Sequence, residues 1–261
     1  MTLKEDTLYR IQKTDILRVG FNADMKPFMY YNKNKELAGF DASYAYLLAE
    51  SLHAKLEFIP FSWPNLVKDI QADRFDIAMS AIYVSESRLG KVSFSEPYFK
   101  SSIAIIAPFG QRGRYKNANQ IQNIKGLRIG IFNDPILIDI IKSNFPNATI
   151  VLLPNFTDAL PIAFAEKKID FALWSKVQCD AFSISHPKYI TLTPDDIAAP
   201  FLMAYMMNKS SSQFVHYVNY WLEINKNNGF YQRAYRHWIL ARPIERTSPR
   251  WSVWHNVLNG F

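Results

Sequence analysis

The chain has 261 residues, of which 49% are hydrophobic and 20% are charged, so it can bury one large core or two moderate ones. Its 30 lysines and arginines exceed its 23 acidic residues and give a formal net charge of +7, but they are scattered and form no basic run. This pattern argues against nucleic acid as a partner and favours small anionic ligands.

Several further function classes are excluded by simple motifs. The single cysteine, Cys179, cannot form an internal disulfide, and we interpret it as a small buried hydrophobe. Zinc-ligand spacings and Gly-x-Gly motifs are missing, so the sequence predicts neither a metal nor a cofactor. No apolar run approaches the ~20 residues of a membrane span. The polar start, Met1 to Asp6, shows no signal peptide, which we interpret as a chain that begins after a removed leader.

Strand and helix patterns alternate along the first hundred residues. A short helix from Leu8 leads into a strand over 16–21, and a helix with apolar residues at helical spacing begins at Phe40. A strand over 55–60 and a helix over 63–72 follow. This β-α-β-α-β order predicts a mainly parallel sheet with ligand chemistry at the carboxyl ends of its strands.

A second β-α-β series follows the apolar, β-branched segment 99–108, which is typical of a crossing between two lobes. Its predicted strands span 127–132, 149–153, 170–174 and 189–192, and its predicted helices span 136–144, 157–166 and 176–184. Asp134-Pro135 and Thr157-Asp158 are expected to be helix N-caps. Residues 200–207 then return to the first lobe.

The segment from Asp76 to Tyr98 combines a buried strand, several hydroxyl groups and one arginine, Arg88. Hydroxyl and N–H groups at a strand end, beside a guanidinium that can hold a carboxylate with two parallel hydrogen bonds, suit the capture of a small anion. Taken alone, Arg88 is better interpreted as an idle surface arginine, one of the 30 lysines and arginines.

Four upstream motifs accompany this segment: LRVG at 17–20, KPF at 26–28, AGFD at 38–41 and WPNL at 63–66. In this order they resemble the extracytoplasmic solute-binding proteins of amino-acid transporters, family 3, which have the type II periplasmic-binding-protein fold. Within that superfamily SWPNL, DRFDIAMS and the stretch from His216 to Trp238 look most like cyclohexadienyl dehydratase, an enzyme on the same scaffold. The resemblance covers about residues 8–238.

The resemblance implies a two-lobed α/β fold, each lobe a mostly parallel sheet flanked by helices, with a ligand cleft between the lobes. Residues 1–102 and 201–261 would form the discontinuous first lobe, and residues 103–200 the second. It also implies a periplasmic location and an ABC transporter permease as a possible partner. Ligand that contacts both lobes only when they are shut would drive closure.

In the first lobe, the resemblance assigns Arg88 to the ligand carboxylate, together with Ser80 and the backbone at Ile82. Trp63 would cover one face of the ligand or belong to the core. Tyr83 departs from the Ser or Thr usual in the family and implies a smaller or differently placed ligand. Other positions implied to line the cleft are Asn22, Met25 and Phe28, the last chiefly as core support.

In the second lobe, the resemblance places an aspartate for the ligand's ammonium where this chain has Ser175. A neutral serine cannot replace it, because an unpaired buried ammonium costs several kcal/mol. Asp134, beside Asn133, would be either the relocated acid or simply a helix cap. The dehydratase's general acid corresponds to Gln178, whose amide has no titratable proton near pH 7.

The leading hypothesis is therefore a periplasmic protein that captures a small carboxylate-bearing ligand, an amino acid or related organic acid, for an ABC transporter, with no catalytic residue. The alternatives are a prephenate or arogenate dehydratase-like enzyme and a non-transport sensor or interaction module. The aromatic tail from Arg250 to Phe261 could pack on the first lobe, contact a membrane or bind a partner. The leading hypothesis requires the Arg88 guanidinium to lie at the mouth of the cleft. It must be neither turned out to bulk solvent nor already paired with a neighbouring acid in an otherwise sealed gap.

Overall fold

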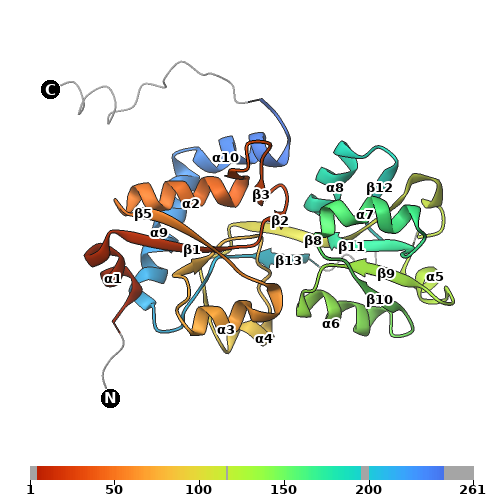
Figure 1. The fold of residues 1–261 in the computed structure, drawn as a ribbon, viewed down its shortest axis with the longest axis horizontal. Helices are drawn as coiled ribbons and strands as arrows, with labels where there is room; N and C mark the ends of the chain where they lie inside the picture. Colours follow the sequence, from red (N-terminus) through yellow and green to blue (C-terminus); the bar gives the residue numbers. More distant parts are fainter. Residues whose placement is uncertain (1–4, 116, 195–199, 244–261) are drawn as a thin grey trace.

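The computed structural model describes residues 5–115, 117–194 and 200–243, which form two α/β lobes placed side by side (Figure 1). The tail 250–261, for which we predicted packing, membrane or partner contacts, lies outside the described residues. Within the three described ranges, no helix is long and apolar enough to cross a membrane.

The first lobe contains a five-stranded sheet in the order β5-β1-β6-β14-β7. Its strands are β1 (Ile16–Phe21), β5 (Lys55–Pro60), β6 (Ile77–Ala78), β7 (Ser93–Phe94) and β14 (Met206–Met207). Strand β1 pairs in parallel with β5 and β6, as the β-α-β pattern predicted, whereas β14 pairs antiparallel with β6 and β7. The antiparallel strand is the one that the chain adds on its return from the second lobe.

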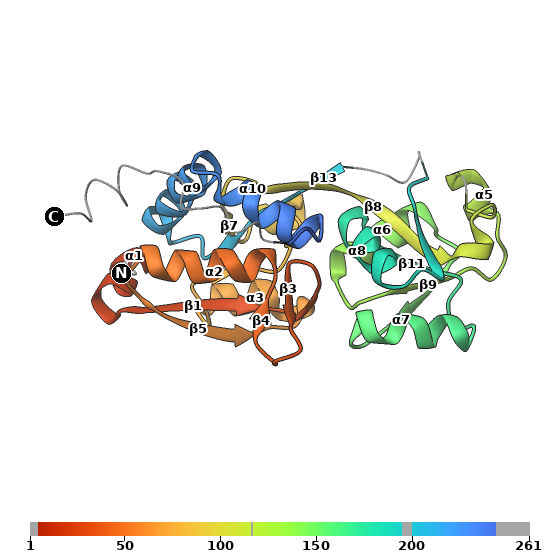
Figure 2. The same cartoon turned by 90° about the horizontal axis from the view of Figure 1, so that it is seen from above.

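Helices and a small second sheet complete this lobe. The helices are α1 (Thr7–Thr14), α2 (Phe40–Ser51), α3 (Leu66–Gln71), α4 (Glu86–Leu89), α9 (Ser212–Asn227) and α10 (Phe230–Ala234), with a 3-10 turn η1 (Trp63–Asn65) and a π-helical turn η3 (Tyr235–Ile239). A three-stranded antiparallel sheet, which the sequence did not predict, comprises β2 (Asp24–Met25), β3 (Met29–Tyr31) and β4 (Leu37–Ala38). This small sheet faces the second lobe (Figure 2).

The second lobe is built on the strand order β10-β9-β11-β8-β12. Its strands are β8 (Phe99–Pro108), β9 (Arg128–Ile131), β10 (Thr149–Leu152), β11 (Phe171–Ser175) and β12 (Tyr189–Leu192). Its helices are α5 (Ala118–Gln122), α6 (Pro135–Asn144), α7 (Phe156–Ala165) and α8 (Lys176–Ser185), with a 3-10 turn η2 (Phe109–Gln111). Strands β10, β9 and β11 run parallel, and β8 runs antiparallel to β11 and β12.

Strand β8 joins the lobes, as the sequence predicted for segment 99–108. Its first residues pair with β13 (Pro200–Met203), and its last residues pair with β11 and β12 in the second sheet. The two strands run between the lobes as an antiparallel connection (Figure 2). The exact division that we predicted, after residues 102 and 200, stays a prediction.

The two predicted helix caps have different outcomes. Asp134 caps α6, because its side chain accepts a hydrogen bond from the Ile136 N–H at 3.0 Å and Pro135 occupies the first turn. The Thr157-Asp158 cap is wrong, since α7 begins at Phe156 and its N-cap position is Asn155. The Thr157 N–H instead donates to the Asp24 carboxylate of the first lobe, at 3.1 Å.

A buried carboxylate, Asp41, holds the chain just after β6. Asp41 is fully buried at the start of α2 and accepts hydrogen bonds from the Ala81 N–H at 2.7 Å and from the hydroxyls of Tyr98 and Tyr205 at 2.9 and 3.3 Å. Ala81 has a positive φ of 51°, a conformation that this hydrogen bond helps to maintain. Burial raises the pKa of Asp41 to about 7, although the three donors oppose the shift.

We therefore expect Asp41 to make the protein less stable as the pH rises from about 4 to 7. The folded state holds this proton up to about pH 7 while the unfolded state loses it near 3.8, so the free energy of unfolding falls across that window. The upper limit of this fall is about 4 kcal/mol, for roughly three pH units at about 1.4 kcal/mol each.

Urea unfolding between pH 4 and pH 8 should show a smaller fall in the free energy of unfolding for Asp41→Asn than for the wild type. An Asp15→Asn variant, changed at an exposed carboxylate, is the control. Identical pH profiles for the wild type and Asp41→Asn would contradict this assignment.

Candidate functional site between the lobes

Arg88 lies at the contact between the lobes and is paired. Its guanidinium donates to the Tyr83 carbonyl at 3.0 Å and to the Asp134 carboxylate of the second lobe at 3.1 Å. The exposed fraction is 5% for the Arg88 side chain and 1% for Asp134. The expectation of an unoccupied guanidinium is thus wrong for this closed arrangement, because an acid of the opposite lobe already neutralises Arg88. A ligand could reach Arg88 only if the lobes separated and the pair with Asp134 were broken.

The position of Asp134 explains this pairing. As the N-cap of α6, its carboxylate lies at the positive end of that helix and faces α4, which carries Arg88. Burial raises the pKa of Asp134, an effect that the charge of Arg88 and the Ile136 N–H only partly offset. Of the two alternatives for Asp134, the helix cap is confirmed, although Asp134 is also the partner of Arg88. Its role as the relocated acid for a ligand ammonium stays a prediction.

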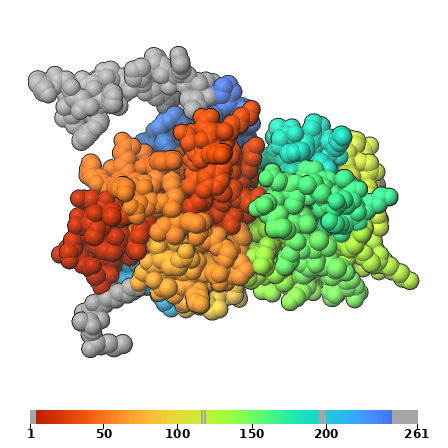
Figure 3. Space-filling view, in the orientation of Figure 1, coloured from red at the N-terminus to blue at the C-terminus, as the bar shows by residue number. Residues whose placement is uncertain are grey.

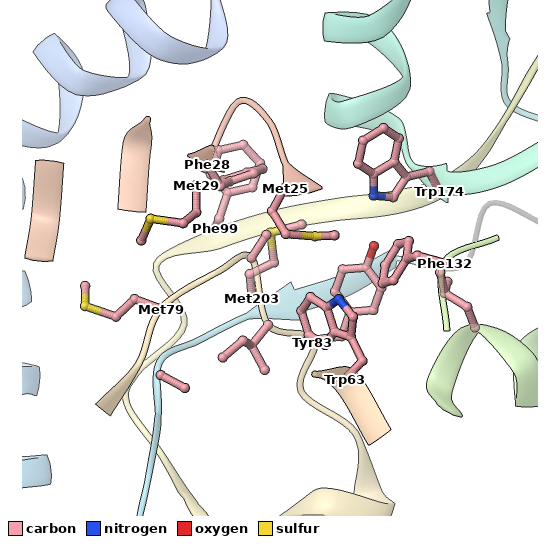
Figure 4. Close-up of a cluster of buried hydrophobic side chains, with 14 of the residues drawn as sticks. Met25, Phe28, Met29, Trp63, Met79, Tyr83, Phe99, Phe132, Trp174 and Met203 are labelled. Atoms are coloured by element: carbon pink, nitrogen blue, oxygen red, sulfur yellow. The ribbon is translucent and has the colours of Figure 1, made fainter. Parts of the chain in front are cut away.

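Three more contacts hold the lobes together. Trp63 of η1 packs on Phe132, which follows β9, with 5.4 Å between ring centroids. The Gln178 amide donates to the Met25 sulfur at 3.6 Å, and Asp24 accepts the Thr157 N–H. Figure 3 shows the lobes touching along the viewed face, and Figure 4 shows Trp63 and Phe132 within a larger cluster of buried apolar side chains.

Other predicted cleft residues of the first lobe serve the lobe itself. The Ser80 hydroxyl accepts the Asn22 N–H at 2.9 Å and lies 2.6 Å from the Met79 carbonyl, so it fastens β6 to the segment after β1. The Asn22 side chain bonds to the Phe61 carbonyl and the Asp24 N–H. Phe28 packs edge-on against Phe40 and Phe99 in the core.

Tyr83 and Ile82 line the link between β6 and α4. The Ile82 carbonyl accepts the Ala204 N–H at 3.1 Å, and its side chain is fully buried. Tyr83 is 4% exposed and packs on Phe201, with 4.2 Å between centroids. The smaller or differently placed ligand that this tyrosine implies stays a prediction.

In the second lobe, Ser175 and Gln178 form one buried unit. The Ser175 hydroxyl donates to the Gln178 side-chain oxygen at 2.6 Å, and Ser175 is the N-cap of α8. Asn133 is exposed, so the structure does not bring it into this cluster. Five residues at or beside the lobe contact were not predicted from the sequence: Asp24, Phe132, Thr157, Phe201 and Trp174. Phe132 and Trp174 could have been found, because both lie at carboxyl ends of parallel strands, where ligand chemistry is expected.

Two surface pockets lie outside this contact. One, of about 770 Å³, is lined mainly by α9 and the segment after β7, including Glu96 and Tyr220. The other, of about 1170 Å³, is lined by β8, α8 and η3, including Ile184 and Ile239. Neither is lined by Arg88, so the polar chemistry that the sequence singled out lies in the closed contact between the lobes.

The chain belongs to the bacterial extracellular solute-binding proteins, family 3, whose family model matches residues 17–241. It is 30% identical over 239 residues to cyclohexadienyl dehydratase of Pseudomonas aeruginosa, covering 92% of this chain and 88% of that protein. It is 26% identical over 143 residues to the ABC transporter arginine-binding protein 1 of Escherichia coli, covering 55% and 56% of the two chains.

Solved structures give the same result for the fold. An ancestral amino-acid-binding protein, described as a precursor of cyclohexadienyl dehydratase, matches with a TM-score of 0.82 and 25% identity, over 90% of this chain and all of that one. The solute receptor for L-cysteine of Neisseria gonorrhoeae matches with a TM-score of 0.80 over 93% and 97% of the two chains, at 19% identity. The predicted family and the two-lobed α/β fold are confirmed.

A double-mutant cycle tests whether Arg88 and Asp134 interact as the structure shows. We expect Arg88→Met and Asp134→Asn each to lower the free energy of unfolding, because each leaves a buried charge without its partner. The double variant should lose less than the sum, with a coupling free energy of about 1–3 kcal/mol in urea unfolding. Asparagine keeps the helix cap at residue 134.

The exposed pair Lys176–Asp180, four residues apart on α8, is the matched control. Its coupling free energy should stay below about 0.5 kcal/mol, since water screens it. Additive losses for the Arg88 and Asp134 substitutions would show that the two side chains do not interact in solution.

Proposed function

We propose that the protein binds a small carboxylate-bearing solute, an amino acid or related organic acid, between its lobes for an ABC transporter in the periplasm. The observation that carries this proposal is the buried Arg88–Asp134 pair, in which opposite charges face each other from opposite lobes. Family membership supports the solute-binding role, and an amino-acid-binding neighbour supports the ligand class.

The pair constrains how a ligand can enter. If a ligand carboxylate replaced Asp134 at Arg88, Asp134 would lose its cation while still facing the closed contact, and an uncompensated buried carboxylate is costly. A zwitterion avoids this cost, because its carboxylate can bind Arg88 while its ammonium binds Asp134. Among carboxylate-bearing solutes, the charges therefore favour an amino acid over an acid without an amine.

Binding would require the lobes to separate, since Trp63 and Phe132 are in contact in the present arrangement. A solute would bind the opened cleft and then bridge the two lobes on closure. Its affinity would be lowered by the free energy needed to break the Arg88–Asp134 pair and the aromatic contact. We accordingly expect modest affinity.

Calorimetric titration with a panel of amino acids tests the proposal. At least one should bind, and Arg88→Ala should weaken its affinity by about 10- to 100-fold, because a charge-assisted hydrogen bond contributes about 1.5–3 kcal/mol. Arg112→Ala, which removes an exposed arginine of the second lobe, should leave affinity unchanged. The 2-hydroxy acid analogue of the bound amino acid should bind more weakly, and Asp134→Asn should reduce that difference. Affinity that survives Arg88→Ala would contradict the proposal.

A dehydratase-like activity is the second candidate, favoured by the 30% identity to cyclohexadienyl dehydratase. Gln178, at the general-acid position implied by the resemblance, accepts from Ser175 and donates to Met25. An amide cannot supply the proton that a leaving hydroxyl needs, and general acid catalysis contributes about 10²–10⁴-fold.

We expect no phenylpyruvate from prephenate with the wild-type protein, measured by its absorbance in base. If Gln178 is what prevents the reaction, Gln178→Glu should gain measurable turnover. Wild-type turnover that is lost in Arg88→Ala would make the enzyme the better account.

A further inference from the structure

Unpartnered hydrogen-bond donors gather at the contact between the lobes. Within residues 5–115, 117–194 and 200–243, the buried side-chain atoms without a hydrogen-bond partner are Arg10 Nε, Trp63 Nε1, Tyr83 Oη, Thr157 Oγ1 and Trp174 Nε1. All of these except Arg10 belong to residues at or beside the lobe contact. Four of these five unpartnered side-chain atoms are thus concentrated in one place.

The two tryptophans come from opposite lobes and flank one phenylalanine. Trp63 belongs to η1 and Trp174 to β11, and their rings lie 5.4 and 6.4 Å from that of Phe132. They are 6% and 1% exposed. In Figure 4 both indole nitrogens lie on the side of the ring that faces the middle of the cluster.

The energetic cost of this arrangement is specific to tryptophan. A buried donor without an acceptor loses its hydrogen bond to water and gains none in the fold, whereas a phenylalanine at either position would fill most of the volume without that cost. Tyr83 is a weaker example: burial raises the pKa of its hydroxyl well above the usual value, but nearby Ser175 partly opposes this rise, so the hydroxyl is not isolated from polar groups. The indole N–H groups of Trp63 and Trp174 are therefore the donors that most clearly lack an acceptor.

An indole N–H can only donate, so its partner must be an acceptor. Arg88 and Asp134 account for the charged ends of a zwitterion, which leaves its side chain to meet the indoles. We propose that Trp63 and Trp174 are specificity-determining residues that select a ligand whose side chain carries oxygen acceptors. A cationic side chain, which offers only donors, is disfavoured. This inference rests on the proposed function.

The test uses calorimetric titration with L-glutamine, L-glutamate, L-methionine and L-lysine, which have side chains of similar length. We expect L-glutamine or L-glutamate to bind at least about tenfold more tightly than L-methionine and L-lysine, the factor that about 1.4 kcal/mol represents. Trp174→Phe should lower this preference about tenfold by weakening the oxygen-bearing ligand, with L-methionine affinity little changed.

Two further variants serve as a second test and as a control. Trp63→Phe should act in the same direction, and it replaces Trp174→Phe if thermal unfolding shows that the latter does not fold. Trp238→Phe is the matched control, because its indole N–H donates to the Ser43 hydroxyl at 2.8 Å within the first lobe.

The outcomes separate this inference from the proposed function. Arg88-dependent binding of L-methionine or L-lysine as tight as that of L-glutamine and L-glutamate overturns the inference and leaves the proposed function standing. A preference unchanged in both Trp174→Phe and Trp63→Phe also overturns it. If none of the four amino acids binds, this inference fails, and the proposed function fails only if the wider panel gives no Arg88-dependent ligand either.

Discussion

Two opposite charges, Arg88 and Asp134, approach each other from different lobes and are buried together. Removing a guanidinium and a carboxylate from water is costly, and their attraction repays that cost only when the pair is well placed and further hydrogen-bonded. Here the Tyr83 carbonyl supports the arginine and the Ile136 N–H supports the aspartate. Any closed state of this protein has to satisfy both charges, either with each other or with a ligand of complementary charge.

The positions of Arg88 and Asp134 follow from the helices and strands that carry them. Arg88 stands on the short helix α4 beyond β6, and Asp134 caps α6 just beyond β9, so both follow interior strands of their sheets. Behind Arg88, the buried carboxylate of Asp41 holds Ala81 in a left-handed conformation and thereby fixes the path of the chain to Tyr83. A substitution at Asp41 is expected to affect the cleft without touching a ligand.

Local patterns predicted the elements well and the contacts across the lobes poorly. The helical spacing after Phe40, the β-branched strand 99–108 and the Asp134-Pro135 cap depend on neighbours in sequence, and all three are present. The Thr157 cap failed because the acceptor for its N–H comes from Asp24, 133 residues away. The resemblance led to Arg88, but no pattern along the chain indicated that Asp134 would reach it. Trp174 was missed because an aromatic residue at a strand end looks like an ordinary core residue.

The most direct test is a crystal structure of the protein grown with the amino acid that binds it most tightly. Our account predicts that the ligand carboxylate lies on Arg88 and its ammonium on Asp134, with the two side chains moved apart beyond the present 3.1 Å. Finding the Arg88–Asp134 pair intact, with the amino acid bound at some other surface, would contradict it.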